Sequence, residues 1–121
     1  MSSLPQISEY DARGSVATAK GAQALGRLLH LAETRQSGQI ERIASFLGGI
    51  CNGKRHFDLY DLRTLDVEIS DDLLTVLDAL RWAKVSIGDM VPNGDARIEA
   101  VLTTWGMFGP EQRGQFICVR D

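Results

Sequence analysis

The sequence predicts an all-α protein, built as a small bundle of four main helices and one short helix. In four separate segments, apolar residues recur every three or four positions, which is the spacing of one helical face. Turn-forming pairs separate these segments, as Asn52 with Gly53 and Asn93 with Gly94 do. The tail at 115–119 has β-type composition, but a single strand has no partner in this pattern. A short extended C-terminal segment is therefore the most β structure that we expect.

A chain of 121 residues is expected to form one domain around one core. In residues 1–14 apolar residues do not recur at a regular spacing, so we expect an N-terminal arm that does not contribute to the core. Residues 15–106 are the predicted helical domain, and residues 107–121 are the predicted C-terminal tail.

The first long helix is expected to begin at Ser15, whose hydroxyl can accept a hydrogen bond from a first-turn backbone N–H. Gly21 and Gly26 each weaken a helix by up to about 1 kcal/mol relative to alanine, so we expect another backbone to approach closely at both. The polar segment at 35–38 ends the helix. Its predicted buried face consists of Val16, Ala19, Ala22, Leu25, Leu28, Leu29 and Ala32.

The second helix is expected over residues 39–51 and antiparallel to the first, because the connection at 37–38 is short. Residues 59–65 are expected to form a helical turn capped by Asp58. An extended link through Val67 and Ile69 should follow it. The predicted buried face of the second helix consists of Ile40, Ile43, Ala44, Leu47, Ile50 and Cys51.

The third helix is expected to begin after Ser70 as its N-cap, with Asp71 and Asp72 in the first turn, where carboxylates favour the helix dipole. Its predicted face consists of Leu73, Val76, Leu77, Leu80 and Ala83. The fourth helix is expected from Asp95 to Gly106, with a face of Ile98, Val101, Leu102 and Trp105. Across the bundle, the residues expected in the core include Leu28, Leu47, Leu77, Val101 and Leu102.

Composition excludes several classes of protein. With 44% hydrophobic and 24% charged residues the chain is too apolar for intrinsic disorder, and its net charge of −3 disfavours a binder of phosphate backbones. The apolar run at 46–51 is far shorter than the roughly 18 residues of a membrane span. The first five residues resemble no signal peptide. We therefore expect a cytoplasmic protein that binds neither membrane nor nucleic acid directly.

Few residues are candidates for chemistry. Cys51 and His56 lie five positions apart, with His30 and Cys118 elsewhere, and these spacings match no zinc motif. His56 beside Asp58 and Asp61 could form an acid–base cluster, but no serine or cysteine lies in the context of an activated nucleophile. The sequence thus predicts no catalytic residue, no metal site and no cofactor.

The charge pattern is more informative, because seven acidic residues and one base, Arg63, lie between positions 58 and 78. These acids, here called the acidic belt, are Asp58, Asp61, Asp66, Glu68, Asp71, Asp72 and Asp78. They could cap helices and cover a solvated face. Alternatively, they could dock on the basic groove of another protein. Arg81 and Trp82 would extend such an interface, since exposed tryptophan and arginine are common anchors, although burial of Trp82 in the core is the simpler alternative.

The region from Leu25 to Leu77 resembles a family of small uncharacterised domains found on bacterial plasmids and other mobile elements. The distinctive part of the likeness is the stretch 57–66. The residues that carry it are Leu25, Leu28, Leu29, 39–47, Asn52, Gly53, Phe57, Asp58, Leu59, Asp61, Leu62, Arg63, Leu65, Asp66, Asp72, Val76 and Leu77. The resemblance implies a setting and transfers no catalytic residue.

In that setting we expect a non-catalytic, anti-CRISPR-like inhibitor encoded by a mobile element. Its partner would be a host defence complex, such as a CRISPR effector subunit, whose basic nucleic-acid groove the acidic belt would occupy. One alternative is a DNA-associated transcriptional regulator or plasmid maintenance accessory protein, although the sequence offers no basic recognition helix. A small hydrolase centred on His56 is the third possibility.

Overall fold

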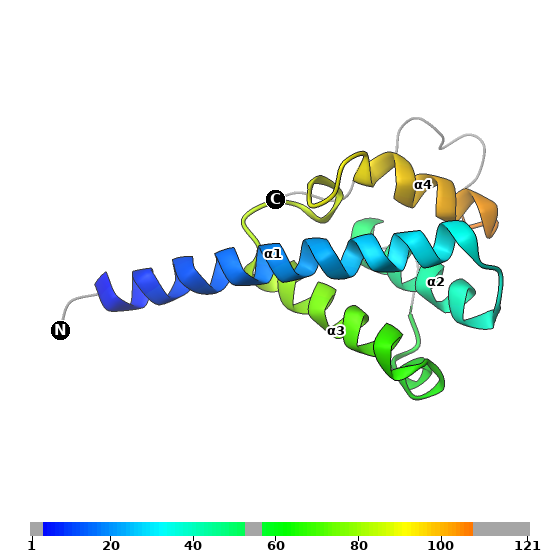
Figure 1. The fold of residues 1–121 in the computed structure, drawn as a ribbon, viewed down its shortest axis with the longest axis horizontal. Helices are drawn as coiled ribbons and strands as arrows, with labels where there is room; N and C mark the ends of the chain where they lie inside the picture. The colour runs from blue at the N-terminus through cyan, green and yellow to red at the C-terminus, as the bar shows by residue number, and fades with distance from the viewer. Residues whose placement is uncertain (1–3, 53–56, 108–121) are drawn as a thin grey trace.

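The computed structural model describes residues 4–52 and 57–107, and within them it confirms an all-α fold without strands (Figure 1). Four α-helices are joined by two short 3-10 helices, labelled η1 and η2. In chain order the elements are α1 (Leu4–Thr34), α2 (Gly38–Asn52), η1 (Leu59–Thr64), α3 (Val67–Trp82), η2 (Ile87–Asp89) and α4 (Gly94–Thr104). None of the described helices is both long enough and apolar enough to cross a membrane. The predicted C-terminal extended segment lies outside the described residues.

The long helix α1 forms the spine of the molecule, and the first turns of its N-terminal half project beyond the other helices (Figure 1). It packs most extensively against α3, while α2 and α4 cover its C-terminal half. The prediction that this helix begins at Ser15 is wrong, because α1 already begins at Leu4. Pro5 does not prevent the earlier start, since a proline in the first turn removes no intrahelical hydrogen bond. Residues 4–14 are thus a continuation of the helix.

The buried face of α1 is built from smaller residues than the apolar pattern predicts. Val16 is 52% exposed, and the helix instead turns Gly14, Ala17 and Gly21 inward. A Cβ atom on Gly21 would lie only 2.4 Å from the Cβ of Ala79, which confirms the expected close approach there. The same expectation is wrong at Gly26, where a Cβ would meet nothing within 4 Å.

The core lies where all four α-helices meet. Leu28, Leu47, Val101 and Leu102 are buried as predicted, whereas Leu77 is only half-buried. Cys51 is buried in the same core. The largest fully buried side chains are Leu25, Leu28, Leu29, Ile40, Ile43, Leu47, Leu73, Ile98, Leu102, Val76 and Cys51.

The segment leading into α3 combines a correct and an incorrect prediction. η1 is capped as expected, with the backbone N–H of Tyr60 donating to Oδ1 of Asp58 at 2.9 Å. The extended link is wrong, because α3 begins at Val67, three residues before Ser70. The Ser70 hydroxyl instead donates to the Val67 carbonyl inside the helix. Asp71 and Asp72 therefore lie in the second turn of α3.

The early start of α3 follows from contacts that join distant parts of the chain. The backbone N–H of Asp66 donates to Oε1 of Gln39 on α2 at 2.8 Å, which fixes the residue before the helix. The helix then buries Ile69, Leu73, Val76 and Ala79 on one face. Leu80, which the sequence places in the core, is 49% exposed.

An arginine–carboxylate pair ties α4 to the end of α1. Nε and Nη2 of Arg97 donate to the two carboxylate oxygens of Glu33, both at 2.8 Å. These hydrogen bonds lower the pKa of Glu33 below its ordinary value of 4.5. The pair therefore contributes stability that is complete above pH 4.5 and is lost as the pH falls through the lowered pKa of the folded state.

We expect Glu33→Gln to lower the free energy of unfolding by less than about 1 kcal/mol near pH 7, since the pair is partly exposed. The difference from the wild type should shrink as the pH falls below 4.5. Denaturant unfolding between pH 7 and pH 3 measures this convergence. Arg97→Gln should show the same convergence, and a difference that stays constant with pH would contradict it.

Candidate functional site

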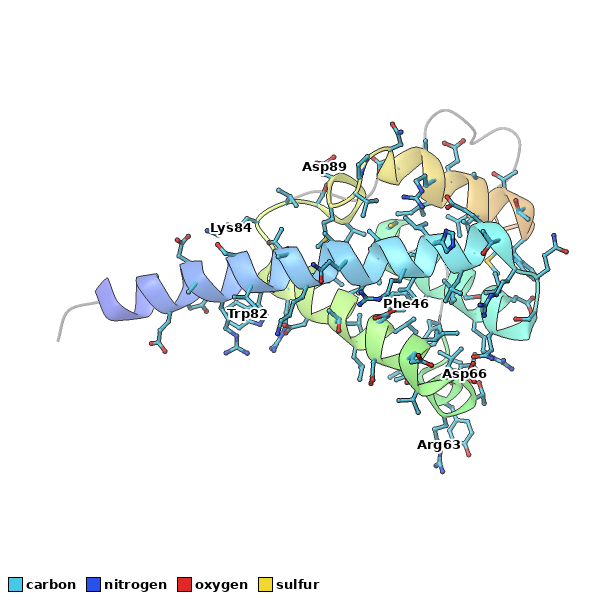
Figure 2. All side chains as sticks on the ribbon, in the orientation of Figure 1. Phe46, Arg63, Asp66, Trp82, Lys84 and Asp89 are labelled. Carbon is cyan, nitrogen blue, oxygen red and sulfur yellow. The ribbon has the colours of Figure 1, made fainter. Side chains whose placement is uncertain are left out.

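The structure divides the nine predicted binding residues between the two ends of α3. Asp58, Asp61 and Asp66 lie in or beside η1, and Glu68, Asp71 and Asp72 occupy the first turns of α3. Asp78, Arg81 and Trp82 lie in the other half of the helix, and at 1.5 Å per residue Trp82 is about 24 Å along the helix axis from Asp66. Figure 2 shows Asp66 and Trp82 at these opposite ends. The predicted residues therefore do not form one continuous site.

Three carboxylates of the acidic belt are paired with arginines. Asp72 binds Arg27 of α1 through two oxygens, with the shortest distance 2.8 Å, and this hydrogen bonding raises the pKa of Arg27. Oδ1 of Asp61 lies 3.7 Å from Nε of Arg42 on α2. Oδ1 of Asp78 lies 3.1 Å from Nη2 of Arg81. The Asp72 pair joins α3 to α1, so this carboxylate has a structural role.

The other four carboxylates of the belt form what we call the acidic corner: Asp58, Asp66, Glu68 and Asp71. Within the described residues none of them has an ion-pair partner. The Asp58 carboxylate caps η1, and Asp66 precedes α3 without a side-chain capping bond. Glu68 and Asp71 are exposed. Negative charge at this corner is therefore concentrated but not neutralised.

Apolar side chains that the sequence interpretation missed lie at the same corner. Leu59, Tyr60 and Val67 are 72%, 67% and 73% exposed. Arg63 places its guanidinium 5.4 Å from the centre of the Tyr60 ring, and it extends away from the bundle in Figure 2. Large apolar side chains that remain exposed and are rimmed by polar groups are typical of interaction sites. The signal in the sequence was an apolar residue, Val67, placed between two acidic residues, Asp66 and Glu68.

At the opposite end of α3, Trp82 contacts the N-terminal half of α1. Its ring lies 5.0 Å from that of Tyr10, and the guanidinium groups of Arg13 and Arg81 lie 4.4 and 5.2 Å from its centre. The indole Nε1 is buried and has no hydrogen-bond partner among the described residues. The half-buried Trp82 thus holds two helices of this chain together, and its role as a partner anchor stays a prediction.

Two grooves accompany these features, and charged residues line both of them. A groove of about 640 Å³ runs between α1 and the start of α3, and Asp66 and Glu68 line it together with residues of α1. A smaller hollow of about 370 Å³ lies beside Tyr10, Arg13 and Trp82. The larger groove shares its acidic residues with the acidic corner.

Of the candidate metal residues, the structure describes His30 and Cys51. His30 is exposed on α1, and Cys51 is buried in the core. His56, on which a hydrolase would depend, and Cys118 lie outside the described residues. The part of the chain that the structure describes contains no group of three or more histidine, cysteine or acidic residues placed to hold a metal ion.

Comparison with known proteins places this fold in a family. The family model of DUF7673, described as a family of unknown function, matches residues 22–106. The match includes the region 25–77, continues through α4 and covers well over half of the chain. Neither a curated protein nor a solved structure matches. The chain belongs to the DUF7673 family of unknown function.

Proposed function

We propose that this protein is a non-catalytic binding module that docks its acidic corner on a basic surface of another protein. The observation that carries the proposal is the set of exposed apolar side chains, Leu59, Tyr60 and Val67, beside carboxylates without ion-pair partners. Apolar contact would supply affinity. The carboxylates would accelerate association and select a partner of complementary charge.

The arrangement favours a protein partner over DNA. A DNA-binding helix needs clustered cations that neutralise phosphates, but α3 presents Glu68 and Asp71 on its exposed side. Several of the cations are already paired within the chain, as Arg27, Arg97 and Lys84 are with Asp72, Glu33 and Asp11. The alternative of a DNA-associated regulator therefore receives less support from the surface.

The setting extends the proposal to a specific kind of partner. A surface that combines carboxylates with apolar side chains could occupy the basic groove in which another protein holds nucleic acid. With the mobile-element setting implied by the resemblance, we propose a cytoplasmic inhibitor of a host defence complex, of the anti-CRISPR kind. The support for this step is the charge of the corner together with that setting.

The test is a matched pair of charge reversals. Asp71→Lys changes a carboxylate at the acidic corner, and Glu9→Lys makes the same charge change at an exposed position in the N-terminal half of α1. A tagged wild-type protein is first used to isolate a partner from host cells, and the purified partner is then bound to each variant. We expect Asp71→Lys to slow association about tenfold and Glu9→Lys to leave the rate within about twofold, since steering depends on local charge.

Salt and apolar contact provide the second comparison. Raising the salt from 0.1 to 1 M shortens the Debye length from about 10 to about 3 Å, so it should slow the wild type more than Asp71→Lys. Val67→Ser should accelerate dissociation, and this acceleration should be the same at 0.1 and 1 M salt. Equal binding by the wild type, Asp71→Lys and Val67→Ser would show that the corner is only a solvated surface.

A further inference from the structure

The groove between α1 and the start of α3 continues the acidic corner and contains charges of both signs. Its volume of about 640 Å³ lies within the range of about 300–1,000 Å³ that is usual for ligand pockets. The charged residues that line it are Arg27 of α1, Arg35 directly after α1, Asp66 directly before α3, and Glu68 and Asp72 in the first turns of α3. The groove is thus positioned to accept a group from whatever binds the corner.

One ion pair crosses this groove and leaves other charges unsatisfied. Arg27 and Asp72 neutralise each other. Among the described residues, the carboxylates of Asp66 and Glu68 and the guanidinium of Arg35 have no ion-pair partner. The groove therefore presents two unpaired negative charges and one unpaired positive charge.

Besides these charged residues and the polar His30 and Gln23, the lining consists of Gly26, Leu31 and Ile69. Ile69 is 8% exposed at the groove, and the half-buried Leu31 lies on the α1 side. Gly26 adds no side chain, and a Cβ there would meet nothing within 4 Å. An aliphatic stem with a charged end suits such a surface, because arginine and lysine bury their methylene groups while their charge stays at the rim.

We propose that this groove binds a basic side chain of the partner polypeptide that is followed closely by an acidic side chain. The stem of the basic residue would lie on Ile69 and Leu31, with its cation at Glu68 and Asp66. The acidic residue would pair with Arg35. This inference rests on the proposed function, since it specifies which part of a basic partner binds in the groove. A nucleic acid supplies only anions and would leave both carboxylates unpaired.

A peptide titration tests the groove without the partner. The probe is the capped pentapeptide Ala-Arg-Ala-Glu-Ala, added to the full chain while backbone amide resonances are followed by NMR. We expect saturable shifts at Gly26 and Ile69 in the millimolar range. Replacing the arginine of the peptide with citrulline, which keeps the shape but removes the charge, should weaken binding about fivefold, as expected for one exposed ion pair.

Variants of the protein assign the contacts. Gly26→Leu should fill the groove and abolish the shift at Ile69, while circular dichroism shows the helices retained. Glu68→Gln should remove most of the preference for arginine over citrulline. In Arg35→Gln, peptides with glutamate or glutamine at the fourth position should bind equally.

The two proposals fail in different ways. Equal binding of the arginine and citrulline peptides, or full binding by Gly26→Leu, would overturn the groove assignment, whereas an effect of Asp71→Lys on the partner would still support the acidic corner. Conversely, partner binding that ignores Asp71 and Val67 would overturn the proposed function even if the peptide binds.

Discussion

Replacing Leu73 with alanine should lower the free energy of unfolding by about 2–5 kcal/mol, the range for removal of a fully buried leucine. Leu73 is 0% exposed and lies in the core cluster with residues of α1, α2 and α4. The alanine would lose the transfer free energy of the missing methyl and methylene groups. It would also leave a cavity that three surrounding helices cannot close without moving.

The neighbouring Leu74 provides the matched control, because it has the same side chain on the same helix and is 53% exposed. Leu74→Ala should change the free energy of unfolding by only about 0.5 kcal/mol. Urea unfolding monitored by circular dichroism measures both variants. Similar losses for Leu73→Ala and Leu74→Ala would mean that α3 does not bury the face described above.

The regular spacing of apolar residues is sufficient to predict that the helices exist, but not which face of each helix is buried. The predicted range for α2 matches the observed helix closely, and the predicted start of α4 at Asp95 lies one residue from the observed start. The predicted face of α1 is correct at Leu25, Leu28 and Leu29. It is wrong at Val16 and Ala19, which are more apolar than the glycines that α1 buries. Close helix packing selects small residues, and a search for hydrophobic residues does not detect that selection.

The starts of α1 and α3 depend on contacts that local sequence does not reveal. Asp66 is held by Gln39, which is 27 positions earlier in the chain. The N-terminal half of α1 lies against Trp82 through Tyr10 and Arg13. A cap predicted from a serine and its neighbours cannot include such long-range partners, so both predicted starts, at Ser15 and after Ser70, came too late.

The sequence predicts that acidic residues are concentrated in the region of the candidate site, but not how they are arranged and paired in space. Counting acids between positions 58 and 78 identifies the carboxylates that lie in or beside η1 and on α3. The pairing of Asp72 with Arg27 joins residues 45 positions apart, so no local pattern separates this structural carboxylate from Glu68 and Asp71. Asp71 is therefore a suitable position to test the acidic corner, because it lies beyond the first turn of α3, whereas Asp61 already has a partner in Arg42.

Gly21 and Gly26 of α1 should respond in opposite directions to the same substitution. Gly21→Ala should lower the free energy of unfolding by about 1–2 kcal/mol, because the cost of overpacking exceeds the gain in helical propensity of up to about 1 kcal/mol. The new Cβ would lie 2.4 Å from the Cβ of Ala79 and 2.6 Å from the Cε of Met90. Met90 can rotate away, but the Cβ of Ala79 is fixed to the backbone of α3, so the helices must separate.

Gly26→Ala removes the same backbone freedom from the same helix without a steric cost, since a Cβ there meets nothing within 4 Å. It should raise the free energy of unfolding by up to about 1 kcal/mol. Urea unfolding of both variants separates helical propensity from packing, because propensity contributes equally to each. If Gly21→Ala were as stable as Gly26→Ala, the contact between α1 and α3 would be looser than the structure shows, and the close approach at Ala79 could not explain why α1 has a glycine at position 21.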